Sequence, residues 1–275
     1  GVAAKISLNA SDLLILTGNE VGIAMCHFIL SRLKKAGKLT SESLVIETYV
    51  TTSLISKIAR DFGVRAIDDL LVGFKFIGDI IEKLENKGDF IFAAEESLGY
   101  LRGSFVRDKD AAISALTLAE LASWLKDENK TLVAYLDEIY LKYGYFKNIL
   151  HMQEMKGKIG FVNTGEVMKG LRASPPSTLG GLKVKRIIDR LPPERSAPDK
   201  YKTGMTGDQL TFILSEDELV RVTVRPSGTE PKIKYYIQNW SSVDGVLDKV
   251  RGAVDKAALD LEKAILAETE RYIKN

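Results

Sequence analysis

The chain is poor in the residues that build covalent or metal-based scaffolds. Its 275 residues include one cysteine, Cys26, and two histidines, His27 and His151. A single cysteine excludes a disulfide framework and a cysteine-rich zinc site. Two histidines leave little room for a histidine-rich metal site or a histidine-dependent triad. Cys26 and His27 lie in an apolar helical run, where we expect a packed thiol and a half-buried imidazole.

The chain also lacks an excess of either charge and any long apolar run. It has 39 Lys and Arg against 37 Asp and Glu. The chain therefore has no strong positive electrostatic field that would favour binding to nucleic acid or to an anionic membrane. No apolar stretch reaches the roughly 20 residues of a membrane helix, and no signal peptide pattern is present. We therefore expect a cytoplasmic protein without a membrane or nucleic-acid partner. The length suits two domains.

Strand and helix patterns alternate through the first half of the chain. Thr17–Glu20 has the spacing of a capping box, and the apolar run Phe90–Ala94 is typical of a strand covered on both faces. This alternation favours a mixed, mostly parallel sheet flanked by helices, an α/β fold. We expect strands at 1–7, 13–16, 44–50, 64–67 and 90–94, and helices at 21–33, 54–62, 76–84, 110–126 and 131–143.

The second half predicts a smaller α+β domain with an antiparallel sheet and helices. Val222 and Val224 alternate with polar neighbours, as a half-buried strand requires. We place the boundary near 148–157, which gives an α/β domain at 1–150 and an α+β domain at 151–275. Strands are expected at 182–188, 210–214, 219–224 and 233–237, helices at 166–172 and 247–265, and a loop at 191–202.

The loop Arg225–Lys232 carries donors that suit a phosphate. It is too long for a tight turn, and its two prolines are expected to exclude ladder pairing. Gly228 permits a backbone whose N–H groups converge. Arg225 adds a planar fork for phosphate oxygens, and Ser227 and Thr229 add hydroxyls. Composition by itself leaves a solvated loop with an incidental arginine equally open.

A polar segment, Ala94–Tyr100, directly follows the apolar strand. Ligands of open α/β sheets bind beyond the carboxyl ends of strands. Glu95, Glu96 and Ser97 would suit a neutral polyol there, since carboxylates accept hydrogen bonds from hydroxyls. An acidic helix start is an equally good interpretation. A paired-carboxylate glycosidase ranks lower, because adjacent glutamates rarely face each other across a substrate.

Two further segments carry weaker signals. Arg107–Asp110 begins a helix, and Lys109 could reach a phosphate or donate a proton, although a solvated charge run is the simpler interpretation. Lys75 lies between aromatic residues at a strand-to-helix turn, where a lysine that packs its stem on apolar surface is the alternative.

These segments, in this order, resemble the α-D-phosphohexomutases, the phosphoglucomutase/phosphomannomutase family. Arg225–Pro231 is similar to the family's phosphate-binding loop, and Glu95–Tyr100 is similar to its sugar-recognition loop. Leu16–Asn19, Gly73–Lys75 and Arg107–Asp110 also fall where the family has similar segments. The resemblance spans nearly the whole chain and covers the third and fourth of the family's four domains, which surround one cleft.

The resemblance also implies what this chain lacks. Nothing is similar to the family's Thr-Ala-Ser-His-Asn-Pro loop, which carries the phosphorylated serine, or to its Asp-x-Asp-x-Asp-Arg magnesium loop. Asp108 and Asp110 supply only an Asp-x-Asp pair beside a lysine, so no metal ligands are expected. We expect a truncation just after the metal ligands, which fits the missing initiator methionine.

The family interconverts hexose 1-phosphate and hexose 6-phosphate, an isomerase reaction that uses a phosphoserine, Mg²⁺ and a hexose 1,6-bisphosphate. The resemblance implies two sets of binding residues: Arg225, Ser227, Gly228 and Thr229 for the phosphate that does not react, and Glu95 and Ser97 for sugar hydroxyls. Lys109 is a weaker candidate for phosphate contact or proton transfer near the reacting end. Lys75 and Arg107 are two further, weaker site candidates.

We therefore expect the substrate-binding half of a phosphohexomutase, inactive alone because the phosphoryl carrier and metal are missing. Its expected partners are a phosphohexose and the missing N-terminal domains. A non-catalytic phosphosugar-binding module is the alternative. Nucleic-acid binding through the smaller domain is disfavoured by the near-neutral charge. Residue identity leaves the choice between glucose and mannose, and the oligomeric state, open.

Overall fold

The computed structural model describes residues 1–5, 7, 11–155, 160–191 and 205–273. They form two compact units, Gly1–Gly144 and Tyr145–Asn275. The division falls a few residues before the expected boundary after residue 150. The functional roles expected for 1–150 and 151–275 stay predictions.

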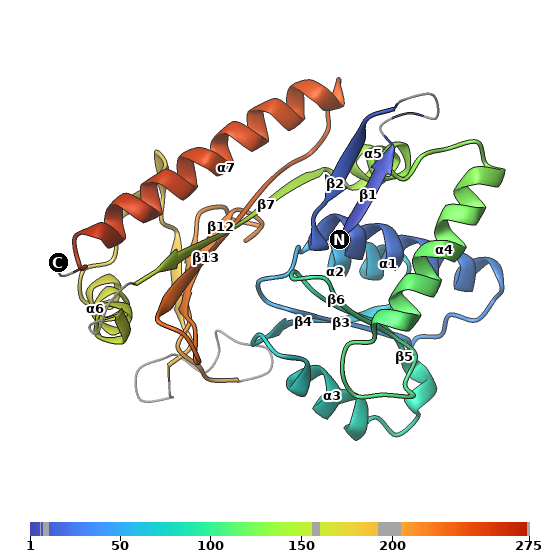
Figure 1. The fold of residues 1–275 in the computed structure, drawn as a ribbon, viewed down its shortest axis with the longest axis horizontal. Helices are drawn as coiled ribbons and strands as arrows, with labels where there is room; N and C mark the ends of the chain where they lie inside the picture. The colour runs from blue at the N-terminus through green and yellow to red at the C-terminus, as the bar shows by residue number, and fades with distance from the viewer. Residues whose placement is uncertain (6, 8–10, 156–159, 192–204, 274–275) are drawn as a thin grey trace. The chain divides into compact units, whose positions relative to one another are not determined.

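The first unit contains a four-stranded sheet in the order β4-β3-β5-β6. β3 pairs in parallel with β4 and β5, whereas β6 is antiparallel to β5, so the expected mixed, mostly parallel sheet is confirmed. The chain runs from β3 to β4 on one side and then crosses to β5 on the other. Right-handed crossovers therefore place α2 and α3 on opposite faces, as Figure 1 shows. The strands are β3 (Leu44–Thr48), β4 (Arg65–Leu70), β5 (Phe90–Glu95) and β6 (Gly99–Arg102).

The described residues of this unit form five α-helices, and the first begins as the sequence predicts. The Thr17 hydroxyl accepts a hydrogen bond from Glu20 N, and Glu20 Oε2 accepts one from Thr17 N, at 3.2 and 2.7 Å. Cys26 is buried and His27 is half-buried inside this helix, as expected. The helices are α1 (Gly18–Lys35), α2 (Leu54–Asp61), α3 (Phe74–Lys83), α4 (Ala111–Asp127) and α5 (Leu132–Tyr143), with a short 3₁₀ turn η1 (Lys87–Asp89).

A separate two-stranded hairpin stands at the start of the first unit. β1 (Val2–Lys5) pairs antiparallel with β2 (Leu13–Leu16). Leu16 lies on the buried face of the hairpin, whereas Leu13 and Ile15 are 60% and 77% exposed. One face of the hairpin therefore packs against the unit, whereas the apolar side chains of Leu13 and Ile15 on the other face are exposed.

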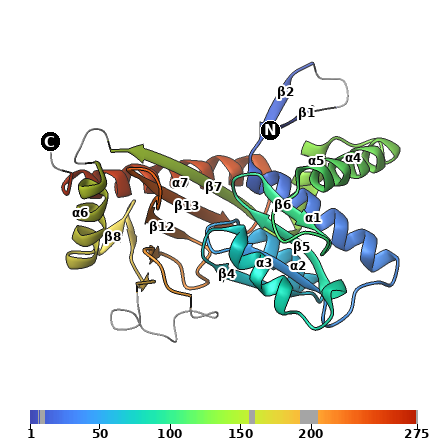
Figure 2. The ribbon, with the colours of Figure 1, turned by 60° about the horizontal axis from the view of Figure 1, so that its bottom comes forward.

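The second unit is built on a five-stranded antiparallel sheet in the order β10-β11-β12-β13-β7. Its core is one apolar cluster formed by the sheet with α6 and α7, and α7 runs along β7 and β13 (Figures 1 and 2). The elements are β7 (Tyr145–Glu154), α6 (Gly160–Ala173), β8 (Thr178–Leu179), β9 (Leu182–Lys183), β10 (Arg186–Asp189), β11 (Leu210–Ile213), β12 (Arg221–Pro226), β13 (Lys232–Ser241) and α7 (Leu247–Glu270).

Two elements of this unit differ from the sequence expectation. β7 was not predicted, because its side chains alternate only weakly between buried and exposed. The strand expected at 182–188 is interrupted, since Lys183 pairs with Thr178 in one sheet and Arg186 pairs with Ile213 in another. Most of the loop expected at 191–202 lies outside the described residues.

None of the helices in the described ranges has the length and apolar character needed to cross a membrane.

Candidate functional site

The carboxyl ends of three parallel strands bring three loops to one edge of the first unit's sheet. The loops follow Thr48 of β3, Leu70 of β4 and Glu95 of β5. β3 lies between β4 and β5. The chain that leaves β3 therefore leads to β4 on one side of β3, whereas the loop after β5 leads to β6 on the other side. Such a switch point is where open α/β sheets bind ligands. The Thr51 hydroxyl spans it by donating to Ala94 O at 3.5 Å.

Glu95 ends β5 with its side chain largely buried. Its Oε1 accepts a hydrogen bond from Gly73 N at 2.7 Å. Gly73 has φ 134°, a conformation that favours glycine. Burial raises the pKa of the Glu95 carboxyl, the Gly73 hydrogen bond opposes that change, and the neighbouring Glu96 adds to it. Glu95 is thus held in one orientation, with Oε2 left for another partner.

Lys109 and Phe74 meet Glu95 around Gly99. A Cβ at Gly99 would lie 3.2 Å from Lys109 Cδ, 3.3 Å from Glu95 Oε2 and 3.4 Å from a Phe74 ring carbon. The Lys109 ammonium lies 5.3 Å from the centre of the Phe74 ring and 2.9 Å from Asp108 Oδ1. The site therefore combines a buried carboxylate, a cation and an aromatic face.

The loop that carries Ser97 is fastened to the start of α1. Tyr100 donates its hydroxyl to Gly18 O at 2.6 Å, and a Cβ on Gly18 would collide with the carbonyl oxygen of Glu96. Leu98 adopts φ 62°, an unusual conformation for a residue with a side chain. Ser97 is exposed and donates to Glu96 Oε1 at 3.0 Å.

Sequence analysis assigned no role to Gly18, Tyr100, Phe74 or the N–H of Gly73. The segments that contain them were singled out by resemblance, but a backbone donor and a close approach between two loops have no signature in one sequence. Asn19 is another residue whose contact could not be predicted from one sequence. Its side-chain oxygen accepts a hydrogen bond from Thr52 N at 3.0 Å.

Two of the weaker candidates do not join the group at Gly99 in this structure. Arg107 donates to Glu82 Oε2 at 2.8 Å and to Ser104 O at 2.6 Å. The hydrogen bond from Arg107 to Glu82 lowers the pKa of the Glu82 carboxyl. The exposed Lys75 places its ammonium 4.9 Å from the centre of the Phe76 ring.

In the second unit, the candidate phosphate loop connects β12 to β13. Ser227 N donates to Lys232 O at 2.8 Å, and Thr229 N lies 3.5 Å from Ser227 Oγ. Pairing extends to Pro226, which is the register partner of Ile233. The expectation that both prolines lie outside the ladder was therefore wrong for Pro226, because a proline at a strand end removes only an N–H donor.

Gly228 does not adopt a left-handed backbone conformation, and the convergence of N–H groups at this loop stays a prediction. Its φ lies outside the left-handed range, and a Cβ there would meet nothing within 4 Å. The protein's own backbone therefore does not require glycine at this position. Arg225 is half-buried, and the described part of the chain provides it with no ion pair or side-chain hydrogen bond.

The acidic residues near Lys109 do not fit a magnesium ion. Asp108 Oδ1 accepts hydrogen bonds from Lys109 N and Nζ, which lower the pKa of its carboxyl. Asp110 caps α4 by accepting from Ile113 N at 3.0 Å. Mg²⁺ needs several oxygen ligands in octahedral geometry. Across the residues that the structure describes, no three His, Cys, Asp or Glu side chains are grouped to hold a metal ion.

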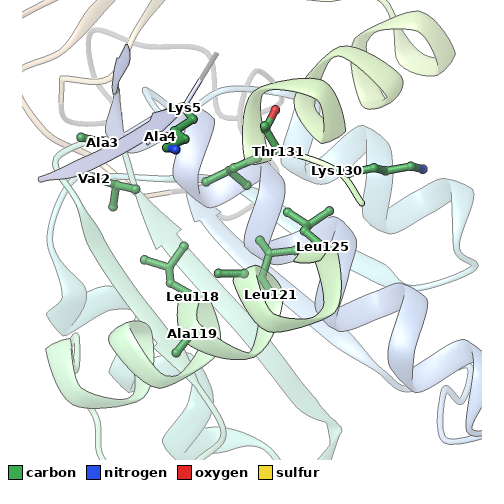
Figure 3. A pocket seen from close by; sticks show the side chains of 12 residues that line it. Val2, Ala3, Ala4, Lys5, Leu118, Ala119, Leu121, Leu125, Lys130 and Thr131 are labelled. Atoms are coloured by element: carbon green, nitrogen blue, oxygen red, sulfur yellow. The ribbon is translucent and has the colours of Figure 1, made fainter. Parts of the chain in front are cut away.

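A cavity of about 440 Å³ lies elsewhere in the first unit, between β1, α4 and the start of α5 (Figure 3). Leu118, Leu121 and Leu125 line it, so its walls are mainly apolar. None of the candidate sugar-binding residues contributes to this cavity, and its apolar walls do not suit a sugar phosphate.

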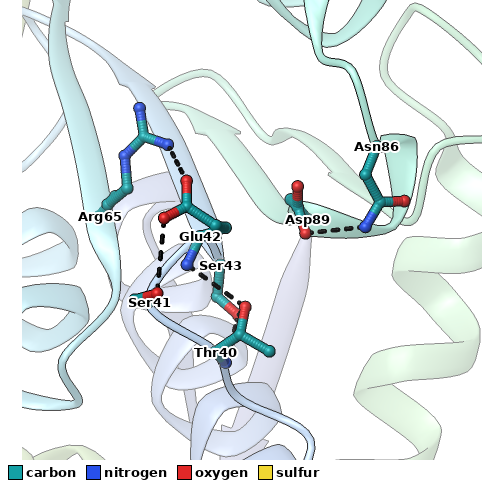
Figure 4. A network of polar contacts seen from close by, with 7 residues as sticks. All are labelled: Thr40, Ser41, Glu42, Ser43, Arg65, Asn86 and Asp89. Atoms are coloured by element: carbon teal, nitrogen blue, oxygen red, sulfur yellow. Dashed lines mark hydrogen bonds and ion pairs between the residues drawn. The ribbon is translucent and has the colours of Figure 1, made fainter.

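The opposite edge of the sheet carries structural contacts instead. Glu42 pairs with Arg65 at 3.0 Å, and Asn86 donates to Asp89 at 2.9 Å (Figure 4). These residues precede or begin β3, β4 and β5. These contacts lie at the amino ends of the strands, whereas the candidate site lies at the carboxyl ends.

The sequence of this chain is similar to those of known proteins. Residues 17–143 match the family model of the phosphoglucomutase/phosphomannomutase α/β/α domain III. The chain is 34% identical over 240 residues to a phosphoglucomutase of Staphylococcus aureus strain RF122, a match that covers 86% of this chain and 42% of that protein. It is 32% identical over 228 residues to a probable phosphoribomutase of Schizosaccharomyces pombe. That match covers 80% of this chain and 38% of that protein.

A crystal structure of pp63/parafusin, a Paramecium phosphoglucomutase in its open form, has the same fold. The TM-score is 0.62 at 17% identity, over 95% of this chain and 44% of that one. Fold and matched regions place the chain among the phosphomutases. It belongs to the α-D-phosphohexomutase family, the phosphoglucomutases and phosphomannomutases, and corresponds to the C-terminal portion of these proteins. The chain spans less than half the length of these relatives.

Proposed function

We propose that this chain is the substrate-binding part of a phosphomutase that interconverts a hexose 1-phosphate and a hexose 6-phosphate. The observation that carries the proposal is the group of Glu95, Lys109 and Phe74 around Gly99, at the switch point of the sheet. A polyol is recognised by acceptors and donors beside an apolar face, and this group supplies all three.

In the first unit, Glu95 would accept hydrogen bonds from sugar hydroxyls through Oε2, because Oε1 is held by Gly73. The exposed Ser97 hydroxyl would donate to or accept from a second sugar hydroxyl. Lys109 would contact a phosphate or transfer a proton near the reacting end. The raised pKa of Glu95 is compatible with hydrogen bonding to a neutral sugar.

In the second unit, Arg225, Ser227, Gly228 and Thr229 would hold the phosphate that does not react. The loop would hold the phosphate in one place, while other residues form hydrogen bonds with the sugar hydroxyls. The substrate could then bind in two orientations. The reaction needs both orientations, since each end of the sugar must reach the phosphoryl carrier in turn.

The chain by itself would bind substrate without turning it over. Phosphoryl transfer depends on a positioned carrier and charge stabilisation. In the whole enzyme we expect Mg²⁺, a hexose 1,6-bisphosphate and the N-terminal domains to complete the site, in the cytoplasm.

Calorimetry with α-D-glucose 1-phosphate tests the two binding roles separately. Arg225→Ala should weaken binding at least ~tenfold by removing a charge-assisted contact, and Glu95→Gln should weaken it less because the amide still accepts hydrogen bonds. Lys263→Met, an exposed change on α7, is the charge-matched control. Equal affinity of the wild type and Arg225→Ala would contradict the phosphate role, and measurable mutase turnover by the purified chain would contradict its predicted inactivity.

A phosphopentose is the second candidate substrate, because one relative carries the name probable phosphoribomutase. Competition between ribose 5-phosphate and glucose 6-phosphate distinguishes the two. Tighter binding of the ribose ester would replace the hexose in the proposal. Loss of binding for both esters would contradict a sugar-phosphate substrate.

A further inference from the structure

Gln209, which directly precedes β11, is a buried polar side chain that the fold does not account for. It is 1% exposed, and in the described part of the chain neither its side-chain oxygen nor its side-chain nitrogen has a hydrogen-bond partner. Buried polar groups are nearly always hydrogen-bonded, because an unpaired amide costs free energy that an apolar side chain of the same shape would not. An amide kept at such a cost points to a function that requires it.

Sheet register places Gln209 beside Arg225, the arginine of the candidate phosphate loop. Arg190 N donates to Gln209 O at 2.9 Å, so the pairing of β10 with β11 continues one residue beyond Leu210. Leu210 and Val224 are register partners, and both belong to the apolar core. Successive side chains of a strand alternate between its faces. Gln209 and Arg225, the next residues along β11 and β12, therefore lie together on the opposite face.

The adjacent polar pair on this face is satisfied, whereas Gln209 and Arg225 are not. Thr211 and Thr223 are register partners, and their hydroxyl oxygens lie 2.9 Å apart in a hydrogen bond. Arg225 is half-buried, and the described residues give it no ion pair or side-chain hydrogen bond. A guanidinium has five N–H donors, and a bidentate contact with a phosphate uses two of them. The other donors of a half-buried arginine need a protein acceptor, and Gln209 Oε1 is an unused acceptor on the same face.

We propose that Gln209 is a positioning residue of the phosphate site. When a phosphate binds, the buried Oε1 accepts a hydrogen bond from the Arg225 guanidinium and orients it toward the anion. An amide suits this role better than a carboxylate, because a carboxylate would pair with Arg225 and cancel the charge that attracts the phosphate. Since its own side-chain atoms are buried, Gln209 acts through Arg225 rather than by touching the anion. The proposal rests on the proposed function, because it concerns the same phosphate site.

Calorimetric titration of the full chain with α-D-glucose 1-phosphate tests the proposal with Gln209→Met, which keeps the shape of the side chain and removes the amide. This variant should bind the ester ~tenfold more weakly, the effect of losing one hydrogen bond to a charged group. It should also unfold at a higher urea concentration, because an apolar group replaces a buried unpaired amide. A lower urea midpoint would show that the amide stabilises the fold and would overturn the proposal.

Gln238→Met is the matched control, because Gln238 is a buried glutamine of the same sheet whose amide is hydrogen-bonded. Its Nε2 donates to Leu219 O at 3.0 Å. The control should therefore lower the urea midpoint and leave the affinity for the ester unchanged. The two glutamine variants are thus expected to differ in opposite directions in stability and in affinity.

A double-substitution cycle shows whether Gln209 acts through the guanidinium. In an Arg225→Lys protein, Gln209→Met should cause no further loss of affinity, because a lysine ammonium is a point charge without a planar fork to orient. Equal losses in the two backgrounds, or wild-type affinity in Gln209→Met, would contradict the proposal while the phosphate role of Arg225 stands. If Arg225→Ala binds the ester as tightly as the wild type, or the wild type itself does not bind it, the proposed function fails as well.

Discussion

At the scale of single residues, the structure separates glycines that the backbone needs from one that it does not. Gly73 has φ 134°, and its N–H orients Glu95. Gly228 has an ordinary φ and open space where a Cβ would be. A ligand that approaches the backbone closely would explain why position 228 carries glycine.

This difference gives the first prediction. Gly228→Ala should change the free energy of unfolding by less than ~0.5 kcal/mol, as surface substitutions do, but should weaken glucose 1-phosphate binding about tenfold. Gly73→Ala should cost ~1–3 kcal/mol of stability, because alanine is strained at that φ. Urea unfolding and calorimetry measure the two effects. A Gly228→Ala protein with unchanged affinity would show that no ligand oxygen approaches this backbone.

His27 gives the second prediction, because it is half-buried among aromatic rings. Its Nδ1 lies 2.6 Å from the Tyr135 hydroxyl. Burial, aided by the nearby Lys142 ammonium, lowers the pKa of His27 from 6.5 to about 4. A lowered folded-state pKa means that the unfolded chain binds the proton first, so stability is lost as pH falls from about 6.5 toward 4.

Urea unfolding at pH 7.5, 6 and 4.5 should show this loss, with ~3 kcal/mol as its upper limit. His27→Gln should reduce the pH dependence, and His151→Gln, at a half-exposed position paired with Glu262, serves as the control. Identical pH profiles for the wild type and His27→Gln would mean that His27 is protonated as readily in the folded state.

At the scale of elements, the candidate site depends on contacts between a helix start and a strand end. α1 begins beside the loop after β5, and Tyr100 of β6 joins them through Gly18 O. The loop that carries Ser97 is therefore positioned by tertiary packing rather than by its own turn.

Tyr100→Phe tests this positioning. It should cost ~1–3 kcal/mol of stability, since a buried carbonyl loses its donor, and it should also weaken sugar-phosphate binding. Tyr143→Phe, which removes a hydroxyl bonded to Asp61 in the same unit, should lower stability without changing the affinity. Equal affinities in both variants would show that the Ser97 loop keeps its place without Tyr100.

At the scale of the whole molecule, the two units have separate cores and one tryptophan each. Trp124 lies in α4 of the first unit, and Trp240 lies in β13 of the second. Each tryptophan can therefore report the unfolding of its own unit.

We expect the fluorescence of Trp124→Phe and Trp240→Phe proteins to give two different urea midpoints. Added inorganic phosphate should raise the midpoint reported by Trp240 alone, because the proposed phosphate loop lies in the second unit and ligand binding stabilises the unit that holds the ligand. A single midpoint that both proteins share, and that phosphate shifts equally, would mean that the chain unfolds as one cooperative body.

Patterns within short stretches predicted much of the fold. The capping box at Thr17, the buried run from Phe90 to Ala94 and the stripe of α7 all form as expected, because local hydrogen bonding and hydrophobic periodicity are written in adjacent residues. β7 was missed, since its alternation is weak and its pairing with β13 is a contact between distant segments.

The sequence by itself indicated most of the order of strands and helices, the loops proposed to bind a sugar phosphate, and the scarcity of cysteine and histidine. Only the tertiary structure decided that Gly73 holds Glu95, that Lys109 and Phe74 gather around Gly99, and that Gln209 shares a face of the sheet with Arg225. The physical reason is that these contacts join residues from different elements, and their geometry is set by sheet register and loop packing rather than by neighbouring residues.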